Sequence, residues 1–182
     1  ADRMSIISAE RVRDELSKLL LTDSPREGLM LLVDTGIASI VLPELPALRL
    51  EPDEHHRHKD VYEHSLTVVD QSIELEKRRG HDPDLVGRLA ALLHDIGKPA
   101  TRRFEPGGKV SFHHHDVVGA KMARKRLKAL NYSSDIVKAV CLLVELHLRS
   151  YGYGDQGWTD SAVRRYVRDA GDQLERLHIL TR

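Results

Sequence analysis

The sequence predicts an all-α protein, with at most one short β-hairpin near residues 101–112. Apolar residues recur at helical spacing through most of the 182-residue chain. Helix-start and helix-stop signals bound these stretches. Apolar residues make up 41% of the chain and charged residues 31%, so an amphipathic helical fold has enough apolar surface for a core.

The N-terminal part predicts a small helical segment. Ser8 can cap a first helix whose apolar residues share one face. Ser24-Pro25 predicts a second helix, with proline at its first position, and Gly36 ends it. We expect this segment to cover residues 1–50, with a polar, proline-containing connection before the main domain of residues 51–182.

The centre of the chain predicts two longer helices and the hairpin. Asp60-Val-Tyr-Glu63 resembles a capping box and opens a helix that ends near Gly80. Asp82-Pro83 opens the next, which Gly97 ends. Glu105-Pro-Gly-Gly-Lys109 lies between short alternating stretches, which predicts a small β-hairpin or an ordered loop.

The C-terminal part predicts four more helices. An amphipathic helix covers Asp116 to Leu130. Ser133-Ser134 then caps a very apolar helix that ends near Leu148 and should lie in the core. Thr159 caps a further helix, and the last begins near Gln173.

Composition excludes several classes of protein. The formal net charge is zero, so the chain as a whole is not a cationic nucleic-acid clamp. The single cysteine, Cys141, allows no internal disulfide and suits a reducing, cytoplasmic setting. No apolar stretch approaches the roughly 20 residues that span a bilayer, so we expect no membrane partner.

The chain contains 11 histidines, and four of them fall at predicted helix ends. Side chains from several helix ends can converge on one point. Neutral imidazole and carboxylate together suit a divalent cation such as Mn, Ni, Mg, Fe or Zn, bound singly or in pairs. The candidate metal ligands are His64, His94, Asp95, His115 and His147. Asp95 and Lys98 are the candidate catalytic residues, because the Lys98 ammonium can hold a substrate phosphate.

A less specific interpretation fits each residue taken alone. A histidine at a helix end is more often a cap or a surface residue, and a His-Asp pair arises easily by chance. The set is far more specific, because Leu92–Pro99 joins an apolar helix to the pair, a glycine stop and a lysine. We interpret His113 and His114 as loop residues or supports for the ligands. Surface or structural roles are expected for His55, His56, His81 and His178.

These residues resemble a known pattern. The spacing His, His-Asp, His, His and a final Asp is similar to that of the HD superfamily of metal-dependent phosphohydrolases. More narrowly, the chain resembles the bacterial CCA-adding tRNA nucleotidyltransferase and poly(A) polymerase family. The stretches that carry this resemblance are residues 58–66, 93–99, 112–120 and 159–165, and, for the RNA-binding-like neck of that family, residues 6–36 and 42–45.

The resemblance implies a helical neck at residues 1–50 followed by an HD-domain helical bundle. It implies a fragment of a tRNA-processing enzyme whose catalytic head, which uses ATP and CTP, is absent: the Gly-Ser phosphate loop of that head does not occur here. It also implies that the HD domain hydrolyses 2′,3′-cyclic phosphates, 2′-nucleotides or phosphomonoesters. The family's final aspartate tends to follow Leu-Thr-Arg, so we expect it beyond Arg182, with Asp169 or Asp172 as substitutes.

Two alternatives remain open. The helices could be a non-catalytic scaffold that contacts the tRNA backbone through basic residues of one helix, although a solvated helix face explains those residues too. The scaffold's contacts would be Lys121, Arg124, Lys125, Arg126 and Lys128. A free-standing HD nucleotidase is the other alternative, against which the neck-like N-terminus argues. The metal, the number of ions, the nucleotides added and the oligomeric state also stay open.

Overall fold

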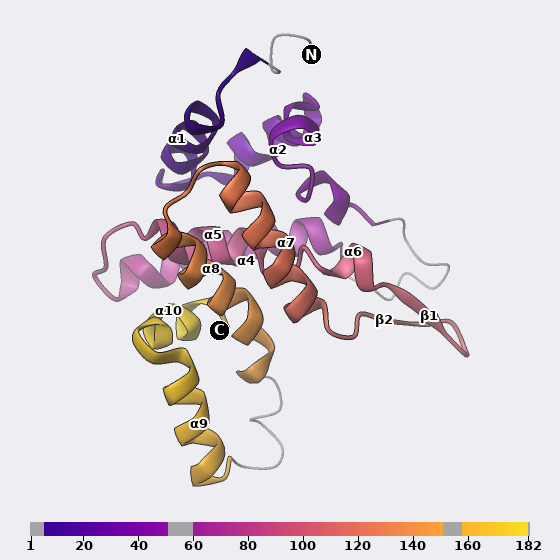
Figure 1. Cartoon of the computed structure of the whole chain (residues 1–182), viewed down its shortest axis with the longest axis vertical. Helices are drawn as coiled ribbons and strands as arrows, with labels where there is room; N and C mark the ends of the chain where they lie inside the picture. Colours follow the sequence, from indigo (N-terminus) through magenta and orange to yellow (C-terminus); the bar gives the residue numbers. More distant parts are fainter. Residues whose placement is uncertain (1–5, 51–59, 151–157, 182) are drawn as a thin grey trace.

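The computed structural model describes residues 6–50, 60–150 and 158–181. Across these ranges the all-α prediction is confirmed, with a single two-stranded hairpin in addition (Figure 1). Residues 51–59, which include His55 and His56, and residues 151–157 lie outside the described residues. The helices are α1 (Ala9–Leu20), α2 (Arg26–Asp34), α3 (Ile37–Val41), α4 (Val61–Arg78), α5 (Leu85–Leu93), α6 (Lys98–Thr101), α7 (His115–Ala129), α8 (Ser134–Leu146), α9 (Asp160–Ala170) and α10 (Leu174–Leu180).

Most helix starts follow their sequence signals. Ser8, Ser133 and Thr159 each accept a hydrogen bond from the backbone N–H three residues later. Asp60 caps α4 through the N–H groups of the second and third following residues. These caps satisfy N–H groups that have no partner within the helix.

Two predicted helix starts are wrong by one or two residues. Pro25 does not occupy the first position of α2, because its carbonyl accepts the first helical hydrogen bond, from Leu29 N at 2.9 Å. The cap of α5 is Asp84 rather than Asp82-Pro83. Asp84 has an extended backbone, and its Oδ2 accepts a 3.1 Å hydrogen bond from Gly87 N.

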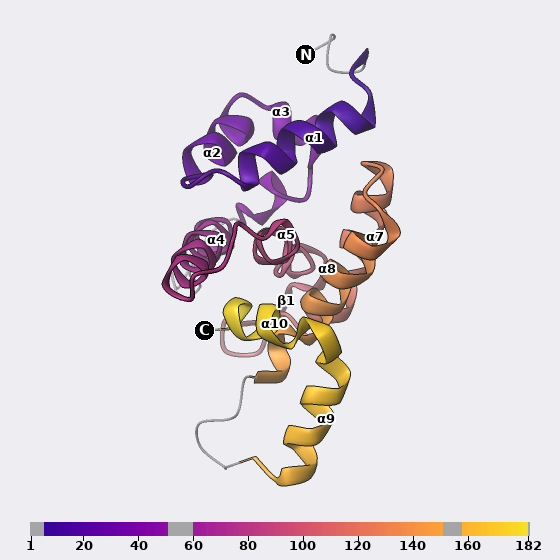
Figure 2. The same cartoon turned by 90° about the vertical axis from the view of Figure 1, so that its left-hand side faces the viewer.

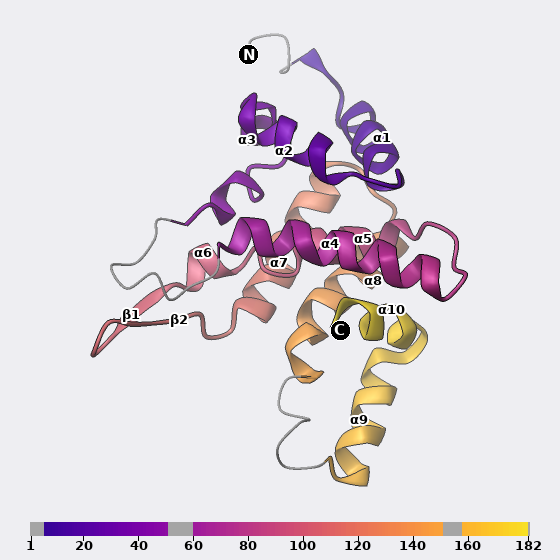
Figure 3. The ribbon, with the colours of Figure 1, turned by 180° about the vertical axis from the view of Figure 1, so that it is seen from behind.

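The predicted hairpin is present. Strands β1 (Arg103–Glu105) and β2 (Lys109–Ser111) are antiparallel, with Phe104 opposite Val110. Gly107 and Gly108 have φ angles of 81° and 75°, which few other residues adopt, so the tight turn depends on them. The hairpin projects from the helical body (Figures 1 and 3).

The core is centred on α5. Every residue from Gly87 to Leu93 is buried, and α5 packs against α1, α4, α8 and α10 (Figure 2). Because α5 is fixed on all these sides, the residues that follow it, His94 and Asp95, have little freedom to move. No helix in the described part of the chain is long and apolar enough to cross a membrane.

The N-terminal helices share this core. Buried residues of α1 and α2, including Leu20 and Leu29, belong to the same apolar cluster as those of α5. Arg88, which is 1% exposed, links the two parts. Its guanidinium donates to the carbonyls of Leu20 and Thr22 at 2.7 and 2.8 Å, and to Glu76 Oε2 at 2.9 and 2.7 Å.

Candidate metal centre

Four separate elements bring the predicted ligands together. His64 lies in the first turn of α4, His94 and Asp95 directly follow α5, His115 is the first residue of α7, and His147 directly follows α8. All five side chains line one cavity of about 270 Å³. The convergence of helix ends expected from the sequence is therefore observed.

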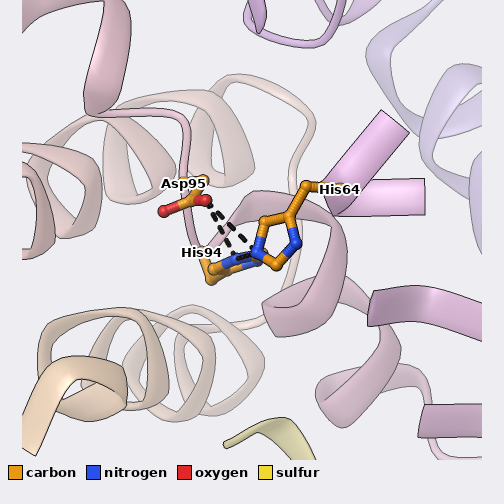
Figure 4. A group of neighbouring side chains, drawn as sticks. All are labelled: His64, His94 and Asp95. Carbon is orange, nitrogen blue, oxygen red and sulfur yellow. Dashed lines mark hydrogen bonds and ion pairs between the residues drawn. The ribbon is translucent and has the colours of Figure 1, made fainter. Parts of the chain in front are cut away.

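Asp95 occupies the centre of this cluster and is 1% exposed. Its Oδ2 lies 3.2 Å from His94 Nε2 and 3.6 Å from His64 Nε2 (Figure 4). Its Oδ1 lies 3.2 Å from His115 Nε2 and 3.8 Å from His147 Nε2. One carboxylate thus faces all four imidazoles.

Three of the imidazoles are oriented by the same hydrogen bond. Nδ1 of each ring lies near the backbone carbonyl three residues earlier, at 2.8 Å for His94, 2.7 Å for His115 and 2.6 Å for His147. A carbonyl only accepts, so Nδ1 must donate. In the neutral ring the lone pair is then on Nε2, which is the atom that faces Asp95.

The surroundings favour a negative Asp95 and a neutral His147. Burial alone would raise the pKa of Asp95, but the neighbouring His115 and His94, with the positive charge of Lys98, hold it well below its usual range. Burial, together with neighbouring His94, lowers the pKa of His147 to about 4. The nitrogen lone pairs and the anionic carboxylate that they face repel each other unless a cation lies between them.

These donors fit a divalent metal. Two groups have ligand atoms within 4.8 Å of one another: His64, His94 and Asp95, and Asp95, His115 and His147. Imidazole nitrogen and carboxylate oxygen suit Zn, Mn, Fe and Ni, and the carboxylate also suits Mg. Asp95 belongs to both groups, so the arrangement suits one ion or a pair that shares this carboxylate.

Lys98 is held at the edge of the same cavity. It is the first residue of the short helix α6, and its Nζ donates a 2.7 Å hydrogen bond to Asp95 Oδ2. The ammonium also lies 5.7 Å from the centroid of the Phe112 ring. The expected phosphate-binding lysine therefore contacts the central carboxylate.

A close backbone contact holds two halves of the cluster together. A Cβ on Gly97 would lie 2.1 Å from the carbonyl oxygen of His115 and 2.7 Å from Gly119 N. Only glycine lets the turn after Asp95 approach the start of α7 this closely. Gly97 thus sets the separation of Asp95 and His115.

The other predicted polar residues lie elsewhere. His81, His113, His114 and His178 are exposed, and His178 stacks on Tyr166 with ring centroids 5.9 Å apart. Asp169 pairs with Arg149 rather than with the histidines. Within the described residues, neither ligand group includes Asp169 or Asp172.

Sequence reasoning missed some residues of the cavity wall. Gln71 and Thr181 supply polar atoms there, and Val68, Leu148 and Leu180 supply apolar surface. Gln71 follows His64 by seven residues, two helical turns, so helical spacing could have identified it. Nothing in the local sequence indicates the contribution of α10, which reaches the site only through tertiary packing.

The family model described as "HD domain" matches residues 61–181, the part of the chain that contains the whole cluster. The chain belongs to the HD domain family. A second model, "Probable RNA and SrmB- binding site of polymerase A", matches residues 1–48, which precede the HD domain.

Relatives of this HD-domain chain are tRNA nucleotidyltransferases. It is 39% identical over 140 residues to a CC-adding tRNA nucleotidyltransferase of Thermus thermophilus, covering 76% of this chain and 31% of that protein. It is 37% identical over 149 residues to an A-adding tRNA nucleotidyltransferase of Deinococcus radiodurans, covering 81% and 33%. A multifunctional CCA protein of Actinobacillus pleuropneumoniae is 32% identical over 145 residues, covering 78% and 34%. The HD-domain chain therefore spans about a third of the length of these relatives.

Proposed function

We propose that this HD domain is a metal-dependent phosphohydrolase that acts on small phosphate esters. The observation that supports this most strongly is the convergence of four imidazoles on the buried carboxylate of Asp95. His64, His94, Asp95, His115 and His147 would hold one or two divalent ions. Such an ion lowers the pKa of water and neutralises phosphoryl oxygens.

The side chains of the cavity have separate tasks in this proposal. Asp95 belongs to both ligand groups, and backbone carbonyls orient three of the imidazoles, because their Nδ1 hydrogen bonds fix the direction of Nε2. Lys98, 21% exposed at its side chain, can turn from Asp95 to the equatorial oxygens of a phosphate. The apolar surface of Val68, Leu148 and Leu180 limits the water that reaches the phosphate.

The size of the cavity favours small substrates. A volume of about 270 Å³ is near the lower end for small-molecule sites. A phosphomonoester, a 2′-nucleotide or a 2′,3′-cyclic phosphate can place its phosphate among the histidines. Gln71 and Thr181 at the wall can hydrogen-bond to the rest of the substrate.

We further infer that the HD domain belongs to a longer tRNA-processing protein. This is supported by the RNA-binding model over residues 1–48 and by relatives named for adding CC, A or CCA to tRNA. Such a protein would use ATP and CTP in a nucleotidyltransferase head. The same match argues against a free-standing nucleotidase.

A second candidate function is a non-catalytic scaffold that contacts tRNA. It is favoured by four exposed basic residues on α7, Lys121, Arg124, Lys125 and Lys128. Arg126, which we also expected in this set, is instead bonded to Glu44 of the neck at 2.8 Å. The two functions are compatible, because the basic residues and the histidine cluster use different parts of α7.

Hydrolysis assays test the first proposal. The chain is incubated with 2′,3′-cyclic AMP and with p-nitrophenyl phosphate, in chelator and then with Mn, Ni or Mg added back. We expect turnover that requires metal and that His94→Ala abolishes, whereas His178→Ala, which changes an exposed histidine that does not line the cavity, retains it. Metal-independent turnover, or equal activity of His94→Ala and wild type, would exclude this site as the hydrolase.

A further inference from the structure

We propose that the β1–β2 hairpin and the exposed face of α7 form one RNA-binding surface, on which Phe104 stacks against an unpaired base. The inference rests on the proposed tRNA partner, and it assigns specific residues to that contact. It does not depend on the hydrolase activity.

Phe104 lies on the surface rather than in the core. Its side chain is 71% exposed, although its cross-strand partner Val110 is 5% exposed. The pairing of β1 with β2 fixes the backbone of Phe104, so its ring is presented to solvent in a defined position. An exposed aromatic ring contributes nothing to the core, and it offers a flat surface for stacking.

The neighbours of Phe104 are cationic. The Arg102 guanidinium lies 4.8 Å from the centroid of the Phe104 ring, and Arg103 and Lys109 are exposed on the same hairpin. The one acidic residue of the hairpin, Glu105, accepts a 2.7 Å hydrogen bond from Ser111. An aromatic ring among cations is the combination that binds single-stranded nucleic acid, through stacking and phosphate contacts. An apolar protein partner would not require these charges.

The basic residues of α7 form a stripe on one side of the helix. Lys121, Arg124, Lys125 and Lys128 follow the i, i+3, i+4, i+7 spacing of one helix face, and all four are exposed. None of them forms an ion pair with another residue in the parts of the chain that the structure describes. Four uncompensated cations along one face suit the repeating charges of a phosphate backbone.

The hairpin and the stripe belong to one stretch of chain that runs toward the neck. Strand β2 leads within a few residues into α7, and the hairpin projects beside the start of that helix (Figures 1 and 3). The far end of α7 is attached to the neck by Arg126 with Glu44, and by Arg13 with the carbonyl of Asn131 at 2.7 Å. The neck is the part that the RNA-binding model matches. An RNA bound at the neck can therefore continue along α7 to Phe104.

Fluorescence anisotropy tests the surface. The whole chain is titrated with a tRNA transcript and with a short single-stranded RNA at several salt concentrations. Phe104→Leu keeps the apolar bulk but removes the ring, so we expect it to weaken binding about tenfold, whereas Phe104→Tyr retains it. The triple variant Lys121→Ala/Lys125→Ala/Lys128→Ala should reduce the slope of log affinity against log salt by about 0.7 per lost phosphate contact with single-stranded RNA.

Matched controls separate this surface from net charge. Lys77→Ala/Arg164→Ala/Arg168→Ala removes the same number of cations from α4 and α9, and Val167→Ala truncates an exposed apolar residue of α9. We expect both to bind RNA like wild type. Far-ultraviolet circular dichroism of every variant checks that the helices are intact.

Three results would overturn the inference. In the first, wild type binds RNA, and Phe104→Leu and the triple lysine variant bind it as tightly as the controls do. The tRNA partner would then be retained, but this surface would not be its binding site. Wild type that binds neither RNA would exclude the tRNA partner itself. If the chain binds polyglutamate as tightly as it binds RNA, the partner of this surface is an acidic protein rather than RNA.

Discussion

Lys98 Nζ donates a 2.7 Å hydrogen bond to Oδ2 of Asp95, the carboxylate at the centre of the histidine cluster. The same oxygen faces His94 and His64. An ammonium and a metal ion on this side of Asp95 would therefore compete for one oxygen. In our proposal Lys98 leaves Asp95 for the substrate phosphate when metal is bound.

Replacing Lys98 should separate metal binding from turnover. Lys98→Met keeps most of the stem but removes the positive charge, so we expect Mn to bind at least as tightly as in wild type. Turnover of p-nitrophenyl phosphate should fall about 100-fold, because a group that stabilises the developing charge is lost. Isothermal titration calorimetry gives the affinity. Loss of metal binding in this variant would show that Lys98 supports the cluster instead.

Gly97 should be needed for the geometry of the site. In Gly97→Ala the new Cβ meets the carbonyl of His115, a backbone atom that cannot rotate away. We expect a loss of about 1–3 kcal/mol in the free energy of unfolding, together with much weaker metal binding. Gly28→Ala is the control, because its Cβ meets only the flexible side chain of Leu19, far from the site. Equal metal affinity in both variants would contradict the proposed role of Gly97.

The buried His147 should make the metal-free protein sensitive to acid. Its pKa is about 4 in the fold against 6.5 when unfolded, so the unfolded state takes up the proton first as the pH falls. The contribution of neutral His147 to the free energy of unfolding is then fully present above pH 6.5. It is lost progressively toward pH 4, by about 3 kcal/mol in all. Urea unfolding in chelator measures this. His147→Gln should flatten the dependence, and an unchanged slope would refute the assignment.

The buried pair of Arg88 and Glu76 should be essential to the fold. Arg88→Met leaves Glu76 as an unpaired buried carboxylate and frees two backbone carbonyls of the neck. We expect Arg88→Met to lower the free energy of unfolding by about 3–5 kcal/mol. The double variant Arg88→Met/Glu76→Leu should recover part of it. Thermal unfolding measures the stability of each variant, and Arg176→Met, which changes a partly exposed arginine, is the control. If Arg88→Met were as stable as Arg176→Met, the prediction would be wrong.

Much of the fold could be predicted because its signals are local. Apolar spacing and the caps at Ser8, Ser133 and Thr159 depend on residues within a few positions of one another. The hairpin was equally visible from its glycine turn. The exact starts of α2 and α5 were not, because the choice among neighbouring polar residues depends on local backbone geometry.

The site was predictable only in outline. Histidines at helix ends indicated that His64, His94, Asp95, His115 and His147 converge, and they do so; that they hold metal remains a prediction. The close approach of Gly97 to α7, and the bonds of Arg88 to carbonyls more than 60 residues earlier, arise from tertiary packing. Such contacts have no signature in a single sequence. That a further aspartate ligand follows Leu-Thr-Arg likewise remains a prediction. Leu180 and Thr181 of that stretch do line the cavity.

The stoichiometry of bound metal tests the central claim most directly. Wild type and Asp95→Asn are equilibrated with Mn, freed of excess metal, and measured by inductively coupled plasma mass spectrometry. Asp95 belongs to both ligand groups, so we expect one or two ions per wild-type chain and essentially none in Asp95→Asn, with Asp169→Asn matching wild type. A wild-type chain without bound metal, or an Asp95→Asn chain with as much as wild type, would contradict a metal centre at this cluster.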